Sequence, residues 1–251
     1  MPNVQLKSNI RRKSRNTNNK TYTIVYASLV VIVVAFLLAF VSKVLEPQSL
    51  ANERIDKKKQ ILASLNVRDV PNSDVESKYE ELVLQDMIVN VNGQVVAEGN
   101  NHDKDGFALS MKEISPEKLP IYVCQVAPGE DGKKFVFPLI GKGLWGSIWG
   151  YIALNSDLRT VYGTYFSHQS ETAGLGARIT ELAFQNQFVG KVISKDGSQD
   201  IDLTVVKSGR VQDTAVECDG ITGATLTCNG VSDMLHDCLS NYKNYLKFDE
   251  K

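Results

Sequence analysis

A short stretch near the C-terminus combines hydroxyl side chains with glycine and alanine, the residue types that can receive an anion at a helix start. It reads Asp219-Gly220-Ile221-Thr222-Gly223-Ala224-Thr225-Leu226-Thr227 and leads into an amphipathic helical pattern. Thr222 is a suitable N-cap, which would place the Thr225 hydroxyl at the third helical position, beside backbone N–H groups that lack intrahelical acceptors. Such a position favours phosphate. The alternative is a capped helix of purely structural role, since Thr-Gly-Ala-Thr also recurs by chance.

A run of glycines around two tryptophans is the second candidate, Gly141-Lys142-Gly143-Leu144-Trp145-Gly146-Ser147-Ile148-Trp149-Gly150. Glycines let the backbone approach a flat ligand closely, and the Trp145 indole can stack on a ring of isoalloxazine size or pack against its edge. The alternative is a strand and turn with two core tryptophans.

The third candidate is a polar segment that becomes rich in glycine, His168-Gln169-Ser170-Glu171-Thr172-Ala173-Gly174-Leu175-Gly176-Ala177-Arg178. Glu171 and Thr172 could hydrogen-bond the polar atoms of a ring or a ribityl chain, and the glycines would expose backbone N–H groups around Leu175. His168 has no partner at metal-ligand spacing, and the chain holds three histidines. We therefore expect a structural or surface role for His168, and no metal site.

Taken in order, the three stretches resemble the motifs of the FMN-binding domain family, and within it those of the C subunits of sodium-translocating NADH:quinone reductases. The matching patterns are Gly-x-Gly-Leu-Trp-Gly, His-x-x-Glu-Thr-x-Gly-Leu-Gly and Asp-x-x-Thr-Gly-Ala-Thr-x-Thr. The resemblance covers nearly the whole chain except its extreme N-terminus. One departure from the family's His-x-Glu-Thr-Pro-Gly-Leu-Gly is an extra residue after His168, and another is Ala173 in place of proline. The spacing from Glu171 onward is kept.

This resemblance implies that FMN is bound covalently, as a phosphoester on Thr225 that a flavin transferase makes from FAD after export. It also implies a set of residues that contact the flavin or its phosphate, namely Trp145, Glu171, Thr172, Leu175, Gly176, Lys207, Thr222, Gly223 and Ala224. For Lys207, a plain solvated lysine is the alternative.

The implied function is that of a redox relay rather than a stand-alone catalyst, because a flavin can move one electron at a time and the sequence shows no acid–base or nucleophile–base pair for a separate reaction. No catalytic residue is therefore assigned. NADH oxidation and the sodium path would belong to other subunits of the same membrane complex, since the chain has neither a dinucleotide fingerprint nor a charge within its apolar span. Electrons would pass toward quinone.

Two other functions stay open. The G subunit of the Rnf electron-transport complex shares the anchor, the flavin domain and the attachment motif, although Leu144 favours the sodium pump because the rival more often has an aromatic residue there. The second alternative is a membrane-anchored periplasmic scaffold without a cofactor.

An apolar segment indicates a membrane anchor. Tyr22 to Val41 carries no charge and is long enough to cross a bilayer as a helix, and the sequence after it offers no convincing site for signal-peptide cleavage. The first twenty residues contain no acidic residue and six basic ones, Lys7, Arg11, Arg12, Lys13, Arg15 and Lys20. By the positive-inside rule, the N-terminus should be cytoplasmic. We expect a single-pass protein of a bacterial inner membrane with its C-terminal domain in the periplasm.

The rest of the sequence predicts one α+β domain. We expect a cytoplasmic tail over 1–21, a transmembrane helix over 22–41, a helical connector over 42–85 and an FMN-binding domain over 86–251. Alternating apolar residues predict a hairpin at Asn92-Gly93 and an antiparallel sheet from strands within 119–126, 134–140, 147–154 and 160–167, with a further strand at 201–206. Helical patterns cover 51–65, 179–189 and 225–246.

Composition excludes some partners. The net charge of −1 argues against binding of nucleic acid. The four cysteines, Cys124, Cys218, Cys228 and Cys238, match no zinc or redox spacing, so we expect buried thiols, although a periplasmic location permits a disulfide.

Overall fold

The computed structural model describes residues 20–100, 103–195 and 200–246. The chain divides into two units between Glu53 and Arg54. Most of the basic N-terminal tail, from Lys7 to Arg15, lies outside the described residues.

The first unit is built on helix α1 (Lys20–Ser64), which continues without a break past the predicted span of Tyr22–Val41 and includes Pro47. Among the described residues it is the one helix long and apolar enough to cross a membrane by length and composition. Its apolar side chains up to Leu50 are exposed, as expected for a segment whose surroundings are lipid rather than protein.

The second unit begins at Arg54, inside the stretch predicted as a connector. The last turns of α1 bury Ile61 and Leu62, and the short helix α2 (Val75–Leu82) adds Val75 and Tyr79 to the same apolar cluster. These residues pack with the sheet residues Tyr122, Cys124, Val136, Tyr151 and Ala153. The end of α1 is therefore part of the domain, because its apolar face has sheet to cover.

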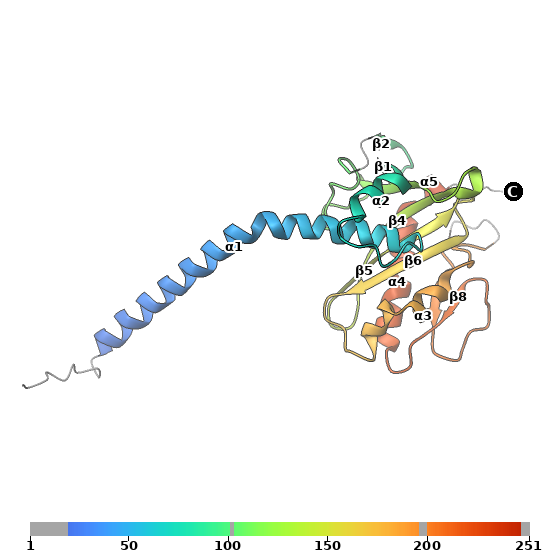
Figure 1. Cartoon of the computed structure of the whole chain (residues 1–251). Coiled ribbons are helices and arrows are strands. Elements are labelled where there is room, and N and C mark those ends of the chain that lie inside the picture. Colours follow the sequence, from blue (N-terminus) through green and yellow to red (C-terminus); the bar gives the residue numbers. More distant parts are fainter. Residues whose placement is uncertain (1–19, 101–102, 196–199, 247–251) are drawn as a thin grey trace, which may run out of the picture. The chain divides into compact units, whose positions relative to one another are not determined.

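A six-stranded antiparallel sheet forms the centre of this unit, in the order β2-β1-β3-β4-β5-β6 (Figure 1). Its strands are β1 (Val83–Val89), β2 (Val95–Ala97), β3 (Leu119–Gln125), β4 (Lys133–Lys142), β5 (Ser147–Asn155) and β6 (Val161–His168). The predicted hairpin is confirmed: β1 and β2 are joined at Gly93, whose φ of 77° suits glycine. The four predicted strands of the central sheet are confirmed as well.

Both faces of the sheet are covered, which explains why β3 is buried along six consecutive residues. The second face packs against helix α4 (Thr225–Asn241), through a cluster that includes Phe137, Ile152, Val231 and Leu235. Figure 1 shows α4 on one side of the sheet and α2 on the other. The α+β prediction is confirmed, with the sheet as the middle of three layers.

The C-terminal helix is divided in two. The predicted apolar stripe of Val231, Leu235, Leu239, Tyr242 and Leu246 is buried, but α4 ends at Asn241 and α5 spans Lys243–Leu246. The Tyr242 hydroxyl donates to the carbonyl of Pro120 at 2.9 Å. This bond holds the junction of the two helices on β3.

The helix predicted over 179–189 is instead a series of short turns, η2 (Gly176–Thr180), α3 (Leu182–Gln185) and η3 (Asn186–Phe188). Gln185 is buried, and its amide donates to the carbonyls of Phe166, Ile179 and Thr180. Phe184 and Phe188 both pack on Phe166. These tertiary contacts take up carbonyl groups that a continuous helix would need for its own hydrogen bonds.

A small second sheet leads into the C-terminal helix. Strand β7 (Thr204–Val206) is shorter than the predicted strand at 201–206 and pairs in parallel with β8 (Glu217–Asp219). Strand β8 ends at Asp219, where the Thr-rich motif begins.

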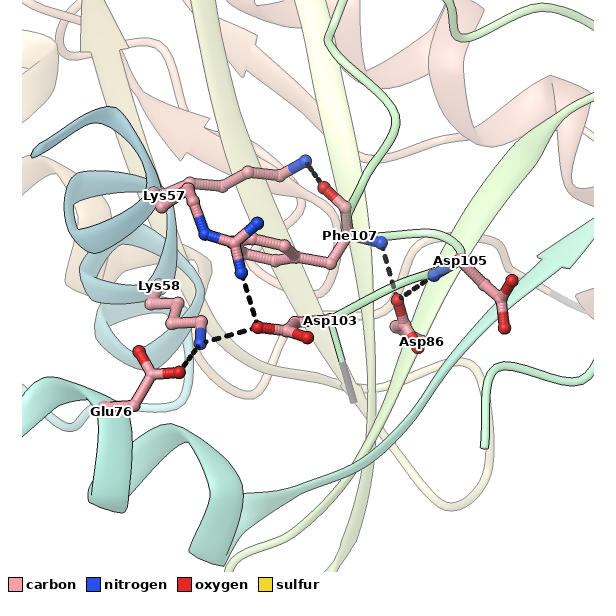
Figure 2. Close-up of polar contacts among 8 residues, drawn as sticks. Lys57, Lys58, Glu76, Asp86, Asp103, Asp105 and Phe107 are labelled. Atoms are coloured by element: carbon pink, nitrogen blue, oxygen red, sulfur yellow. Dashed lines mark hydrogen bonds and ion pairs between the residues drawn. The ribbon is translucent and has the colours of Figure 1, made fainter. Parts of the chain in front are cut away.

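A loop over residues 103–109, which lies between β2 and β3 in the sequence, is here called the strap. It is hydrogen-bonded to the end of α1 and to β1 (Figure 2). The Asp86 carboxylate on β1 accepts the backbone N–H groups of Asp105 and Phe107, each at 2.9 Å. Lys57 on α1 donates to the carbonyls of Phe107 and Leu109 at 2.6 and 2.7 Å. The strap is thus bonded on both sides.

A buried lysine with two carboxylate partners, one of them exposed, accompanies the strap. The ammonium group of Lys58, whose side chain is 1% exposed, contacts Glu76 at 2.5 Å and Asp103 at 3.1 Å. Arg54, Lys57 and Lys58 also lie over the Phe107 ring, at 4.7–5.4 Å from its centroid. Buried lysines are stable when they are paired in this way.

All four cysteines are free thiols; Cys124, Cys218 and Cys228 are buried, as predicted, and Cys238 is partly buried. Burial raises the pKa of Cys124 well above its ordinary value and that of Cys218 to about 12. Burial also raises the pKa of Cys228 and Cys238. The thiols are therefore protonated and act as small apolar side chains.

Candidate flavin site at the end of the sheet

The three sequence motifs meet at one end of the sheet because of the strand pairing. Strands β4 and β5 are joined by a tight tip over residues 143–146, closed by the N–H of Gly143 donating to the Gly146 carbonyl at 2.8 Å. His168, at the end of β6, pairs with Ile148 beside this tip. Gly230 of α4 packs on the backbone of Lys142 at the end of β4. The start of α4 therefore also lies near the hairpin tip.

The start of α4 differs from the prediction. The helix begins at Thr225, its N-cap is Ala224, and Thr222 is not the N-cap. Gly223 has a φ of 82°, and the Ala224 N–H donates to the Ile221 carbonyl at 3.0 Å, so the chain makes a turn before the helix. Thr225 is therefore the first helical residue and not the third.

This shift strengthens the case for an anion site. The first intrahelical bond of α4 runs from the Cys228 N–H to the Ala224 carbonyl, at 2.9 Å. The N–H groups of Thr225, Leu226 and Thr227 therefore have no acceptor inside the helix, and the first turn carries no acidic residue. The positive end of the helix dipole is added to these amides.

The three threonine hydroxyls of the motif have different surroundings. Thr225 is exposed, and no hydrogen bond of its hydroxyl is found among the residues that the structure describes. Thr227 is buried and donates to Oε2 of Glu171 at 2.6 Å. Thr222 is exposed and donates to the Ser208 hydroxyl at 3.1 Å. Of the three threonines, Thr225 is therefore the exposed one whose hydroxyl has no partner among the described residues.

A hollow of about 190 Å³ lies beside Thr225. Seven of the predicted site residues line it: Glu171, Thr172, Leu175, Gly176, Gly223, Ala224 and Thr225. Three lining residues were not assigned from the sequence, namely Leu144, Leu226 and Thr227. A signal for the two leucines was available, since each is an apolar residue inside a polar or glycine-rich motif.

Four exposed apolar residues in the motifs at the hollow are here called the apolar rim. It consists of Leu144, Trp145, Leu175 and Leu226, which are 46%, 67%, 40% and 58% exposed. Trp145 does not line the hollow itself, but it follows Leu144 at the hairpin tip, and it is not a core residue. Exposed apolar side chains gathered at a hollow that also holds a few polar groups are typical of a binding site.

Lys207 and Thr222 are not among the residues that line the hollow. Lys207 is exposed on a turn in which the Gly209 N–H donates to the Asp219 carboxylate at 2.6 Å. The backbone of Asp219 is bonded in turn to the Gln187 side chain. The Asp219 carboxylate therefore links the turn over residues 207–210 to the segment that precedes α4.

The residues at this site fit the two parts of FMN separately: the phosphate with its ribityl chain, and the ring. The hollow is smaller than the roughly 300–1,000 Å³ of pockets that enclose a whole ligand, so it suits a phosphate and the start of a ribityl chain. Its amides and hydroxyls suit the same groups. A flat ring would have to extend over the apolar rim.

A larger hollow of about 600 Å³ lies elsewhere, between the end of α1 and β6. Gln60, Arg68, Tyr165 and Leu182 are among its lining residues, none of which belongs to the three motifs. The smaller hollow is the better candidate because the motif residues converge on it.

Comparison with known proteins identifies the domain in which this hollow lies. Residues 143–240 match the family described as the FMN-binding domain, a range that contains the hairpin tip and the start of α4. The C subunit of the Na(+)-translocating NADH-quinone reductase from Chlamydia pneumoniae is 35% identical over 226 residues, which cover 76% of this chain and 70% of that protein. Its counterpart from Haemophilus ducreyi is 28% identical, covering 87% and 89%.

Solved structures with a similar fold are also C subunits of this reductase. The crystal structure of the C subunit from Parabacteroides distasonis is 40% identical, with a TM-score of 0.73 over 80% of this chain and 96% of that one. The structure from Shewanella oneidensis, 21% identical with a TM-score of 0.65, shows the shared fold. With its flavin-domain motifs gathered at one site and this degree of identity along most of its length, the chain belongs to the family of C subunits of the Na(+)-translocating NADH-quinone reductases.

Proposed function

We propose that this chain carries FMN as a phosphoester on Thr225 and relays electrons toward quinone within a sodium-pumping NADH:quinone reductase. Family membership supports the place in the complex. The surroundings of Thr225 support the attachment point.

One observation carries the proposal: Thr225 combines an exposed hydroxyl with the first position of a long helix. An attached phosphate would lie beside the N–H groups of the first turn, which stabilise negative charge. Thr227 is buried and bonded to Glu171, and Thr222 lies in the turn that precedes the helix. Neither offers the same combination.

The attachment reaction balances with FAD as the co-substrate of a flavin transferase. A bond forms between Thr225 Oγ1 and the phosphorus on the riboflavin side, while the pyrophosphate bond of FAD breaks. AMP leaves with the bridging oxygen, and the hydroxyl proton passes to the transferase or to solvent. The exposed position of Thr225 lets a separate enzyme reach it.

When bound, FMN would supply one-electron transfer between neighbouring redox centres. The chain's own residues would hold and orient it: the first turn of α4 binds the phosphate, and Leu144, Trp145, Leu175 and Leu226 contact the ring. Because these four side chains are exposed, a ring that they held would be within reach of partner subunits, which suits a relay. The single membrane helix would keep the domain near those subunits.

The test is intact-mass and peptide mass spectrometry on the full chain, produced with and without the transferase. Thr225→Val keeps the β-branched shape but removes the nucleophile, so it should lack the FMN adduct. Thr225→Ser keeps a hydroxyl at the same place and should be labelled. Thr222→Val is the matched control, since it alters an exposed threonine of the same motif and should retain the adduct.

Each alternative has its own outcome. An adduct in Thr225→Val, or one that maps to another residue, would refute the attachment point. A chain that stays unlabelled with active transferase and FAD would favour the cofactor-free scaffold. The relatives described above are subunits of the sodium pump, which favours the pump over the Rnf complex.

A further inference from the structure

Glu171 connects three segments that are far apart in the sequence. Its Oε1 accepts the backbone N–H of Trp145 at 2.8 Å, and its Oε2 accepts the Thr227 hydroxyl at 2.6 Å. Its own N–H donates to Nδ1 of His168 at 3.1 Å. The side chain is 7% exposed. The hairpin tip and the first turn of α4 therefore meet at the Glu171 carboxylate, while the end of β6 contacts the backbone of the same residue.

Two glycines make room for this carboxylate. A Cβ added to Gly143 would lie 2.5 Å from Oε1 of Glu171. A Cβ added to Gly176 would lie 2.6 Å from Oε2 of Glu171 and 2.5 Å from the Thr227 hydroxyl oxygen. Real side chains do not approach this closely, so backbone from two loops is packed directly on the Glu171–Thr227 pair.

The sequence predicts that Glu171 contacts the flavin directly. In the structure both of its carboxylate oxygens already accept hydrogen bonds from within the protein. The carboxylate lines the hollow but is anchored on either side of it. This arrangement suits a residue that orders the site better than one that is free to bind a ligand.

We propose that Glu171 is the positioning residue of the acceptor site. Its carboxylate holds the hairpin tip with Trp145 against the first turn of α4, and it takes up the Thr227 hydroxyl. Thr225 is then presented to the transferase, and the apolar rim is held in place to receive the ring. This inference rests on the proposed attachment of FMN to Thr225.

The conservative variant Glu171→Gln can keep both contacts. Its amide oxygen can accept from the Trp145 N–H, and its amide nitrogen can donate to Thr227, whose hydroxyl can act as an acceptor. Glu171→Ala loses both. Glu181→Ala is the matched control, because Glu181 is exposed and pairs with Arg178 only a few residues away.

The experiment measures FMN transfer to the full chain in detergent with purified transferase and FAD, at a temperature where every variant is folded. The readouts are the initial transfer rate, the labelled residue and the fluorescence anisotropy of the attached flavin. We expect Glu171→Ala to be labelled on the order of tenfold more slowly and to hold its flavin with lower anisotropy, because the acceptor and the rim are misplaced. Glu171→Gln and Glu181→Ala should resemble the parent.

Thr227 supplies a second test of the same contact, with Glu171 left in place. Thr227→Ser keeps the donor and should behave as the parent, whereas Thr227→Val leaves Oε2 of Glu171 unpaired and should slow transfer. If the two residues act as one unit, Glu171→Ala combined with Thr227→Val should be no slower than Glu171→Ala alone.

The outcomes separate this inference from the proposed function. If the parent itself is not labelled on Thr225, the attachment proposal fails. If the parent is labelled on Thr225, but Glu171→Ala and Thr227→Val match its transfer rate and its flavin anisotropy, the positioning role alone is wrong.

Discussion

At the scale of single residues, the site is defined by what each polar group already contacts. Thr222, Thr225 and Thr227 have the same side chain within one short motif, yet Ser208 and Glu171 engage the outer two. Apolar residues show a similar contrast. Trp149 donates its indole N–H to Gln60, whereas Trp145 stands 67% exposed at the hairpin tip. Exposure at the tip supports the proposal that Trp145 contacts the flavin ring.

Replacing Trp145 with alanine should weaken the packing of the flavin ring without removing the covalent bond. Loss of an aromatic contact costs about 0.5–1.5 kcal/mol, whereas attachment depends on the hydroxyl of Thr225. The measurements are flavin fluorescence, absorbance spectrum and redox potential of labelled protein, with Trp149→Phe as the control. A Trp145→Ala variant whose flavin is identical to that of the parent by all three would show that this indole does not touch the ring.

At the scale of elements, the site depends on how closely α4 approaches β4. Gly141 leaves room for Met234, because a Cβ on Gly141 would lie 2.6 Å from the Cβ of that side chain. Gly230 in turn lets α4 rest on the backbone carbonyl of Lys142, next to the hairpin tip. The glycines allow helix and strand to pack closely enough for the first turn of α4 to reach Glu171.

The variant Gly230→Ala should therefore be destabilised, although alanine is the better helix former by about 1 kcal/mol. The added methyl group would overlap the Lys142 carbonyl, which is backbone and cannot rotate away, so a net loss of roughly 1–3 kcal/mol is expected. Asn229→Ala, on the exposed side of the same helix, is the control and should stay within about 0.5 kcal/mol of the parent. Denaturant unfolding of the full chain measures both, and equal stability of Gly230→Ala and Asn229→Ala would refute the packing argument.

The burial of Lys57 beside the strap leads to a prediction about how stability depends on pH. Burial lowers the pKa of Lys57 from 10.5 to about 8, and Arg54 adds to this effect, while Asp86 and Glu113 oppose it. Between these two pH values the unfolded chain binds more protons at this site than the folded one, so the contribution of Lys57 to stability rises with pH in that window. Below about pH 8 both states are charged and the contribution is constant.

The comparison with Lys57→Met isolates this effect, because methionine is unbranched and uncharged. The free energy of unfolding of the parent relative to the variant should increase as the pH rises from about 8 to 10.5. Denaturant titrations of the full chain in detergent across this range provide the measurement. A difference that stays flat, or one that falls, would show that Lys57 is not desolvated by the strap.

At the scale of the whole molecule, the chain joins one long apolar helix to one flavin domain. The six basic residues that precede Tyr22, with no acidic residue among them, favour a cytoplasmic N-terminus. The domain would then lie on the periplasmic face of the inner membrane, where a transferase acting after export could reach Thr225.

Protease treatment of intact spheroplasts tests this topology. We expect the C-terminal domain to be digested from outside, while a tag placed before Tyr22 survives until the membrane is opened with detergent. A cytoplasmic protein serves as the control for spheroplast integrity. Protection of the C-terminal domain in intact spheroplasts would reverse the orientation.

Local patterns in the sequence determined the elements whose cause is itself local. The uncharged run from Tyr22 to Val41 indicated the apolar helix, Asn92-Gly93 indicated the hairpin, and alternation of apolar residues indicated the central strands. Three ordered motifs indicated the family. In each case a short range of sequence carries the reason, whether it is hydropathy over a helix length, a positive φ at Gly93 or a side-chain period of two residues.

The tertiary structure decided which groups meet and which stay free. No local rule pairs Thr227 with Glu171, 56 residues away, or leaves Trp145 exposed while β4 and β5 are buried on both sides. The start of α4 moved to Thr225 because the turn at Gly223 is bonded to neighbouring segments, which outweighs the capping preference of Thr222. Hydrogen bonds between distant segments depend on the path of the whole chain, and only the folded structure contains that path.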